Sequence, residues 1–298
     1  MSYGDTLRTD QAFERYEQIR ARMPEARFGN DTQACSGLLE IADQYDAFLL
    51  DSFGVLNVGE RAVPGAIACI AELRRRGKLI AVLTNAASYT QITATERYAR
   101  LGFDFAAHEV ISSRDVAARR LSEVLPNALW GAIAAPGDGF EDISARVVHW
   151  TGQPVDGILM LSSVSIDGAM LAALRDELAR APKPLVVGNP DLVAPREAGL
   201  SKEPGFYAHA LADDLAITPI FFGKPFADAF DDGLGVLAGI PADRIAMVGD
   251  TLHTDILGGA QAGMGTVLVR DHGLFAGLDT APFIARSGIV PDFSCAAI

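Results

Sequence analysis

Four apolar runs of this sequence are each followed at once by a side chain that can take part in chemistry. "FLL" leads to Asp51, "IAVL" to Thr84 and Asn85, "IFFG" to Lys224, and "IAMVG" to Asp250. In an open parallel sheet the carboxyl ends of the strands share one edge, and ligands bind there. Side chains far apart in sequence would then converge: a carboxylate nucleophile, a hydroxyl and an amide for an anion, a lysine for charge, and a carboxylate for a divalent metal. Each signal alone is weak, since an aspartate after a strand is often a turn residue, so their order and strand context carry the prediction.

The elements that must position these residues alternate between short apolar runs and helical stretches. This alternation predicts an α/β fold, a Rossmann-like parallel sheet with helices on both faces. After residue 110 the pattern is less regular, and "ALWGAIAAPG", "VDGILMLS" and "PLVVGNPD" indicate three further strands. Beyond residue 215 the alternation resumes with "ITPIFFGKP", "RIAMVGD" and "GTVLVRD". We therefore expect a core domain built from residues 28–120 and 206–298, with an inserted α/β domain at 121–205.

Residues 1–27 form a separate N-terminal unit in this scheme. A helix is predicted over residues 9–25, with Phe13, Tyr16 and Ile19 along one side. The interpretation that we favour is docking of this side onto the rest of the chain. The alternative is contact with a partner, including a second copy of the chain in a homodimer.

Composition excludes several classes of partner. The 298 residues include 25 Lys and Arg against 38 Asp and Glu, a net charge of −13, which argues against nucleic acid as a partner. No apolar stretch is long enough to cross a membrane and no signal peptide is seen, so a cytoplasmic protein without a membrane partner is expected. The 3 cysteines have no CxxC spacing and predict neither a disulfide framework nor a zinc site. An acidic protein that binds phosphate would need a local positive charge or a metal.

The motifs in this order resemble those of the haloacid dehalogenase (HAD) superfamily. "LLDSFGVL" is similar to its first motif, "AVLTN" to its second, "GKP" to its third and "GDTLHTD" to its fourth. The resemblance covers about residues 45–275. The length of the insertion, with "GNPD" near its end, resembles the class IIA branch, in which an α/β cap domain covers the core. Many members of that branch are sugar-phosphate, nucleotide or p-nitrophenyl phosphatases.

The resemblance implies a nucleophile and a metal site. Asp51 would attack phosphorus and form an aspartyl-phosphate intermediate. Asp51, Asp250 and the main-chain carbonyl of Phe53 would hold Mg²⁺, with Asp255 supporting the site behind them. Hard oxygen ligands of this kind suit Mg²⁺.

The resemblance also implies how the transferring phosphoryl group is bound. Thr84, Asn85 and the catalytic Lys224 would hold it. Mg²⁺ and Lys224 would then supply the positive charge that the acidic composition lacks.

Phe53 departs from the pattern of the superfamily's phosphatases, which usually have an aspartate two residues after the nucleophile. That aspartate protonates the leaving oxygen and then helps to activate the hydrolytic water. Such proton transfer contributes ~10²–10⁴-fold in rate. Without it, turnover should be slow on alkyl phosphates and less affected for a good leaving group such as a phenolate.

Two other functions stay open for this sequence. An aromatic residue at position 53 also resembles the dehalogenases of the superfamily, which need no metal and no leaving-group proton. The presence of both Asp250 and Asp255 favours phosphoryl chemistry over that reading. The second alternative is a protein that binds phosphate and metal without turnover.

The substrate loop is expected in "VVGNPDLVAPRE". Asn189 and Asp191 are candidates to hydrogen-bond a polar leaving group, with turn formation an equally weighted alternative, and Arg196 is a weaker candidate. His253, His209 and Tyr207 are the other groups that could approach the site, and a structural role is favoured for each. The predicted function is a Mg²⁺-dependent phosphohydrolase acting on a small phosphorylated metabolite such as a sugar phosphate.

Overall fold

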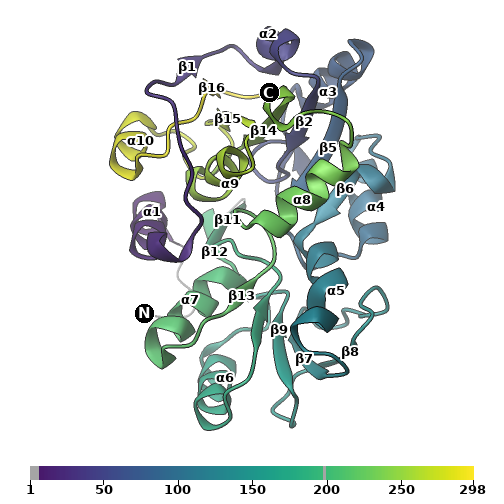
Figure 1. Ribbon diagram of the computed structural model, residues 1–298, viewed down its shortest axis with the longest axis vertical. Helices are drawn as coiled ribbons and strands as arrows, with labels where there is room; N and C mark the ends of the chain where they lie inside the picture. The colour runs from purple at the N-terminus through teal and green to yellow at the C-terminus, as the bar shows by residue number, and fades with distance from the viewer. Residues whose placement is uncertain (1–6, 197–198) are drawn as a thin grey trace.

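The computed structural model describes residues 7–196 and 199–298. The chain forms two α/β layers, each consisting of a β-sheet with the helices that cover it, and the two are stacked along the long axis of the molecule (Figure 1). Within the described residues, no helix combines the length and apolar character that a membrane span requires.

The first layer is built on a seven-stranded sheet in which every neighbouring pair is parallel. The central strands are fully buried apolar runs, which is typical of a parallel sheet covered on both faces. Its order is β1 (Gln33–Ala34), β16 (Phe293–Cys295), β15 (Gly265–Val269), β14 (Ile245–Gly249), β2 (Ala47–Leu50), β5 (Leu79–Thr84) and β6 (Val110–Ser112). The α/β class predicted from the sequence is confirmed.

Helices cover both faces of this sheet. One face packs against the helices α2 (Leu38–Ile41), α3 (Ala66–Arg75) and α4 (Gln91–Leu101). The other face packs against α5 (Ser113–Val124) and α8 (Ala227–Val236). The remaining elements of this layer are α9 (Leu257–Gln261), α10 (Ala281–Ser287), a small hairpin of β3 (Asn57–Val58) and β4 (Arg61–Ala62), and helical turns at Ala42–Gln44, Ala107–Glu109, Ala242–Arg244 and Leu252–Ile256.

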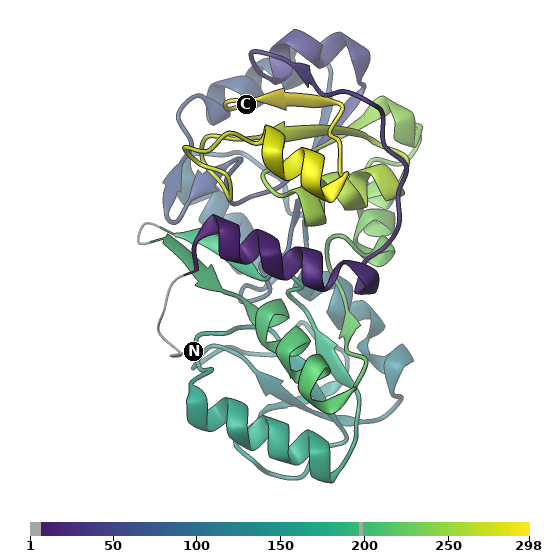
Figure 2. The same ribbon diagram turned by 90° about the vertical axis from the view of Figure 1, so that its left-hand side faces the viewer.

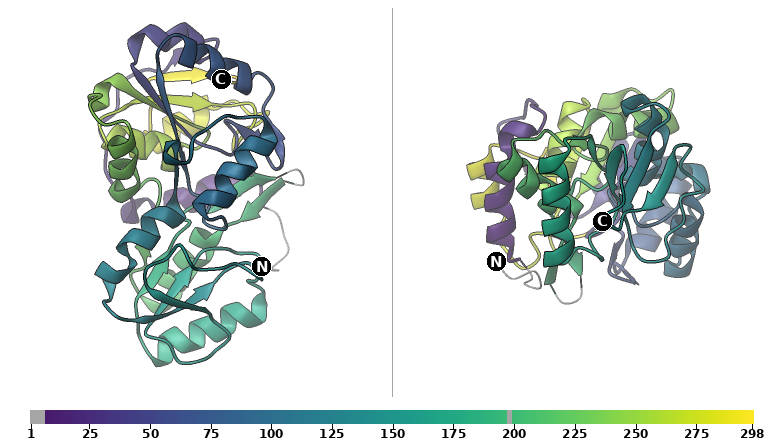
Figure 3. Two further views of the ribbon diagram at one scale, coloured as in Figure 1. Left: turned by 90° about the vertical axis from the view of Figure 1, so that its right-hand side faces the viewer. Right: turned by 90° about the horizontal axis from the view of Figure 1, so that it is seen from below.

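The second layer is a five-stranded sheet, also parallel throughout. Its order is β13 (Ile220–Phe221), β10 (Leu185–Val187), β9 (Gly157–Met160), β7 (Leu129–Ile133) and β8 (Arg146–His149). The helices α6 (Gly168–Arg180) and α7 (Pro204–Leu215) lie on one face of this sheet (Figure 3), and α5 from the first layer lies on the other. Because this sheet runs from residue 129 to residue 221, it extends beyond the limit at 205 that we set for the insertion.

The assignment of "IFFG" to the core sheet is wrong. These residues contain β13, which pairs with β10 at the edge of the second sheet. A short apolar run can be buried in either sheet, so its pattern does not identify its neighbour. Only three of the four predicted strand ends therefore belong to the core sheet.

An antiparallel hairpin extends from the second layer toward the first. It consists of β11 (Val193–Arg196) and β12 (Gly199–Lys202), with Val193 opposite Lys202. Leu192, Val193 and Leu200 pack with residues of the first layer in one apolar cluster. The hairpin thereby closes one side of the space between the layers.

Helix α1 (Thr9–Gln18) lies across the junction of the two layers, followed by a helical turn at Arg20–Arg22 (Figure 2). Phe13, Tyr16 and Ile19 are each 1 % exposed, so the side of the helix predicted to dock is buried within the chain. The Tyr16 ring stacks on His253 of the first layer, at 4.9 Å between centroids. The Tyr16 hydroxyl accepts a 3.2 Å hydrogen bond from the main-chain N–H of Leu192, which precedes the hairpin. The helix therefore ties the two layers together.

Replacing Tyr16 by phenylalanine should lower the free energy of unfolding by about 1–3 kcal/mol, because the buried N–H of Leu192 loses its acceptor. Urea titration of both proteins measures the difference. Tyr89→Phe is the matched control, since the half-buried Tyr89 hydroxyl has no hydrogen-bond partner among the described residues. Equal stability of wild type and Tyr16→Phe would show that this bond contributes nothing.

Candidate active site

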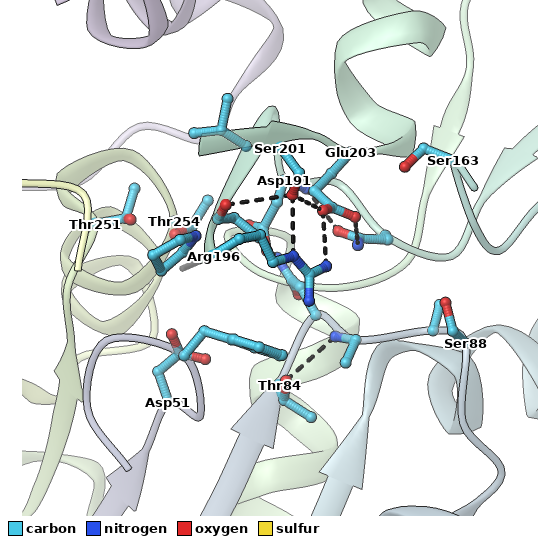
Figure 4. Close-up of a pocket in the computed structure, with 18 of the residues that line it drawn as sticks. Asp51, Thr84, Ser88, Ser163, Asp191, Arg196, Ser201, Glu203, Thr251 and Thr254 are labelled. Carbon is cyan, nitrogen blue, oxygen red and sulfur yellow. Dashed lines mark hydrogen bonds and ion pairs between the residues drawn. The ribbon is translucent and has the colours of Figure 1, made fainter. Parts of the chain in front are cut away.

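The carboxyl edge of the core sheet opens into a cavity of about 520 Å³ between the two layers. Asp51 follows β2, Thr84 ends β5 and Asp250 follows β14, and all three line the cavity. Asn189 and Asp191 reach the same cavity from the loop after β10. Figure 4 shows Asp51 and Thr84 on one side and the residues of the second layer facing them. Chain segments from both layers thus form a single site.

Three buried carboxylates lie together at the core side of the site: Asp51 and Asp250 line the cavity, and Asp255 lies behind them. Oxygens of Asp51, Asp250 and Asp255 lie within 4.8 Å of one another. Asp250 accepts hydrogen bonds from the Thr251 hydroxyl at 2.9 Å and from the main-chain N–H of Leu274 at 2.6 Å. Burial, aided by the neighbouring carboxylates, raises the pKa of Asp250 well above its usual range. The geometry holds three carboxyl groups close together, which disfavours the ionisation of all three.

Lys224 is the cation of this cluster, although β13 belongs to the other sheet. Its Nζ lies 2.5 Å from Asp51 Oδ1 and 2.6 Å from Asp255 Oδ1, and the residue is 1 % exposed. Burial opposes the lysine charge, but the two carboxylates outweigh it and raise the pKa of Lys224. Burial raises the pKa of Asp51 to about 6 even though Lys224 opposes this shift. One ammonium is therefore too little charge for three carboxylates.

A divalent cation fits this donor set. The three carboxylates offer hard oxygen ligands with an excess of negative charge, which suits Mg²⁺. The main chain is shaped around Asp250: a Cβ atom added to Gly54 would lie 2.8 Å from its side chain, and one added to Gly273 would lie 2.0 Å from its Oδ2. Gly54 has a φ of +83°, which glycine adopts readily. The backbone next to Phe53 consequently passes close to Asp250.

Asn85 links the core to the second layer. Its Oδ1 accepts a 2.7 Å hydrogen bond from the main-chain N–H of Lys224. Its Nδ2 donates to the Lys224 carbonyl at 3.0 Å and to Asp191 Oδ1 at 2.8 Å. Thr84 Oγ1 accepts a 3.2 Å bond from the N–H of Ala86. The Asn85 side chain thus fixes both the lysine and the loop above it.

The loop from the second layer forms the turn considered for it and also borders the cavity. Asn189 Oδ1 accepts a 3.0 Å bond from the Asp191 N–H, which is turn geometry, and both residues line the cavity. Asn189 Nδ2 also donates to Glu203 at 3.3 Å. Glu203 forms a 3.0 Å ion pair with Arg196, and Ser201 donates to it at 2.6 Å. Glu203 and Ser201 were not predicted from the sequence, because nothing in their local pattern marks them as pocket residues.

Phe53 lies between two arginines from different layers. The guanidinium carbon of Arg97, on α4, is 5.1 Å from the ring centroid, and that of Arg196, on β11, is 5.0 Å away. Such cation–π contacts are worth about 0.5–1 kcal/mol at exposed positions and more where they are desolvated. Arg97 also donates to the Gly59 carbonyl at 2.6 Å. Phe53 therefore packs against both layers and offers no acid to the cavity.

The other titratable groups considered as replacements do not line the cavity in the described structure. His253 is buried against Tyr16, and its Nε2 lies 2.6 Å from Glu17 Oε1. His209 stacks on Phe221 at 4.6 Å, and burial lowers its pKa to about 3. Tyr207 is buried in α7.

The fold and the site together define a two-layered α/β protein in which the second layer covers a cluster of carboxylates. The family described as haloacid dehalogenase-like hydrolase matches residues 48–143, and a second HAD-like hydrolase family matches residues 221–293. The chain belongs to the HAD superfamily of hydrolases. The two matches include Asp51, Thr84 and Asn85 in the first and Lys224, Asp250 and Asp255 in the second.

Similarity to known proteins extends through the second layer. An acid sugar phosphatase of Staphylococcus aureus is 27 % identical over 253 residues, covering 84 % of this chain and 94 % of that protein. A possible sugar phosphatase from Cytophaga hutchinsonii superposes with a TM-score of 0.78 at 26 % identity, covering 89 % of this chain and 98 % of that one. A glycerol phosphate phosphatase from Mycobacterium tuberculosis, crystallised with magnesium, has a TM-score of 0.69 at 23 % identity, covering 85 % and 76 %. The last of these shows the fold alone.

Proposed function

We propose that this protein is a Mg²⁺-dependent phosphohydrolase that acts on a small phosphorylated metabolite, in particular a sugar phosphate. The observation that carries the proposal is the cluster of Asp51, Asp250 and Asp255 around Lys224, in which Asp51 and Asp250 line a cavity that the second layer covers. The similarity to sugar phosphatases supports the substrate class.

The metal would be held by Asp51, Asp250 and the main-chain carbonyl of Phe53, with Asp255 behind them. When bound, Mg²⁺ supplies positive charge to the phosphoryl oxygens. The residues fit this assignment because one ammonium leaves the cluster with an excess of negative charge.

The chain's own residues would carry the covalent chemistry. An oxygen of Asp51 attacks phosphorus and forms an aspartyl-phosphate, which water then hydrolyses, so that one difficult step becomes two easier ones. Lys224, held in place by Asn85, neutralises charge on the transferring group without reorganising during the reaction. Thr84 and Asn85 complete the binding of the phosphoryl group.

Asn189 and Asp191 would contact the leaving group from the second layer. Phe53 occupies the position of the usual acid, so the proton for an alkyl leaving group has to come from another residue. A phenolate needs no such proton, and aryl phosphates are therefore the substrates least affected by Phe53.

Phosphate release from p-nitrophenyl phosphate and a panel of sugar phosphates, with Mg²⁺ and with EDTA, tests the proposal. We expect release that requires Mg²⁺ and returns when EDTA is titrated with excess Mg²⁺. Release unaffected by EDTA, or halide release from a 2-haloacid in EDTA, would contradict it in favour of dehalogenase-type chemistry. Thermal stabilisation by phosphate and Mg²⁺ with no release from any substrate would indicate a binding protein instead.

A further inference from the structure

The position of the leaving group follows from the position of the nucleophile. In phosphoryl transfer the attacking and leaving oxygens lie roughly in line on opposite sides of phosphorus. Asp51 attacks from the core sheet, so the leaving oxygen must face the second layer (Figure 4). An acid that replaces the missing aspartate should therefore come from the second layer rather than from the loop after Asp51.

We propose that Asp191 donates the proton to the leaving oxygen and then accepts a proton from the hydrolytic water. This inference rests on the proposed phosphatase function and assigns to Asp191 the step that Phe53 cannot perform.

The loop that carries Asp191 is closely packed against its surroundings. A Cβ atom added to Gly205 would lie 2.0 Å from the Pro190 carbonyl oxygen, and one added to Gly223 would lie 2.6 Å from Pro190 Cδ. These contacts hold the loop against the start of α7 and against the residue that precedes Lys224. The Asp191 carboxyl group therefore has a fixed position above the floor of the site.

The two oxygens of Asp191 have different surroundings. Oδ1 accepts the 2.8 Å bond from Asn85 Nδ2, which places Asp191 one hydrogen bond away from a residue proposed to bind the phosphoryl group. Oδ2 has no hydrogen-bond partner among the described residues, and Asp191 lines the cavity. This arrangement suits a carboxylic acid whose carbonyl oxygen is held by Asn85 and whose hydroxyl faces the substrate.

The charges around Asp191 favour the protonated form. Burial is the largest cause of the raised pKa of Asp191, and the negative charges of Asp51 and Asp255 raise it further. The positive charge of Lys224 opposes this shift, and the resulting pKa of Asp191 is about 8. Tyr16 is the titratable group on the α1 side. On the adjoining hairpin, Arg196 pairs with Glu203. Below about pH 8 the Asp191 carboxyl group therefore carries the proton that a general acid needs.

The other carboxyl groups of the second layer that line the cavity are engaged elsewhere. Glu203 forms the ion pair with Arg196 and accepts a bond from Ser201. Asp138 Oδ2 accepts a 3.2 Å bond from the Ala135 N–H and has no described contact with Thr84 or Asn85. Among the second-layer carboxyl groups that line the cavity in the described structure, Asp191 is the one that accepts a hydrogen bond from Asn85, a residue proposed to bind the phosphoryl group.

The proposed steps balance. In the first, Asp51 Oδ forms a bond to phosphorus while the bond from phosphorus to the leaving oxygen breaks, and that oxygen takes the Asp191 proton. In the second, water occupies the place of the departed alcohol and gives a proton to the Asp191 carboxylate. The water oxygen bonds to phosphorus as the bond from phosphorus to Asp51 breaks. This step releases phosphate and restores both Asp51 and Asp191.

The test compares Asp191→Asn with wild type on two kinds of leaving group, in Mg²⁺. Asparagine keeps the acceptor for Asn85 but has no acidic proton. We expect kcat/KM to fall ~10²–10⁴-fold for the sugar phosphate that wild type hydrolyses fastest, and less than about threefold for p-nitrophenyl phosphate. The two substrates should also differ in the pH dependence of the wild-type enzyme. The rate on the sugar phosphate should fall above about pH 8, and the rate on p-nitrophenyl phosphate should not fall there.

Asp138→Asn is the matched control, since it makes the same chemical change in the same cavity. Any effect of that variant should be equal for the two substrates. Equal loss on both substrates in Asp191→Asn, or full retention on both, would overturn the role of Asp191 while leaving the phosphatase proposal intact. Absence of phosphate release from the wild type would overturn both, which keeps the two failures distinguishable.

Discussion

Replacing Asp51 by asparagine is expected to lower phosphate release by about 10⁴-fold or more, the range that loss of a covalent nucleophile costs other hydrolases. Asparagine has nearly the same shape but cannot form the acyl phosphate. The loss should be the same for aryl and alkyl substrates, because the nucleophile acts in both. Steady-state phosphate release at saturating Mg²⁺ measures it.

This substitution should not unfold the protein. The pKa of Asp51 is raised in the folded state, mainly by burial, so its ionised form opposes folding at neutral pH in the absence of metal. Lys224 keeps Asp255 as a partner at 2.6 Å when the charge of Asp51 is removed. In EDTA, the Tm of Asp51→Asn should therefore be equal to or higher than that of wild type.

Asp250→Asn is the control that separates loss of the nucleophile from loss of a metal ligand. It removes the same charge from the same cluster but leaves Asp51 in place. Its half-maximal Mg²⁺ concentration should rise at least about tenfold, and high Mg²⁺ should restore part of its rate. Substantial activity of Asp51→Asn at any Mg²⁺ concentration would contradict covalent catalysis by Asp51.

The sequence predicted the features that depend on local pattern. Buried strands such as β2 and β14 are continuous apolar runs that end in polar residues, and their parallel arrangement brings Asp51 and Asp250 to one edge. Lys224 also reaches this edge, although its strand was assigned to the wrong sheet. The lysine is placed by its hydrogen bonds to Asn85, which are independent of the sheet to which β13 belongs.

The features that the sequence did not predict depend on contacts between distant segments. Nothing near Phe53 indicates that Arg97 and Arg196 lie on either side of its ring. Nothing near Asp191 indicates that enclosure raises its pKa, since this shift comes from the surrounding three-dimensional structure.

Replacing Lys224 by methionine should have the second large effect, on stability as well as on rate. The substitution leaves three buried carboxylates without their cation, and breaking a buried ion pair from one side costs about 3–5 kcal/mol. The rate should fall by about 10²–10³-fold, because a fixed charge on the transferring group is lost. Thermal unfolding in EDTA and phosphate release in Mg²⁺ measure the two effects.

Because the carboxylates remain in Lys224→Met, its loss of stability should depend on pH and on Mg²⁺. Lys224 lowers the pKa of Asp51, so its removal raises that pKa further, and a proton can replace the missing charge at low pH. The Tm difference from wild type should therefore shrink as the pH falls from about 8 to about 5. Mg²⁺ should raise the Tm of Lys224→Met more than that of wild type, since the ion supplies charge to the same oxygens. A Tm difference that ignores both pH and Mg²⁺ would show that Lys224 stabilises the protein by packing rather than by its charge.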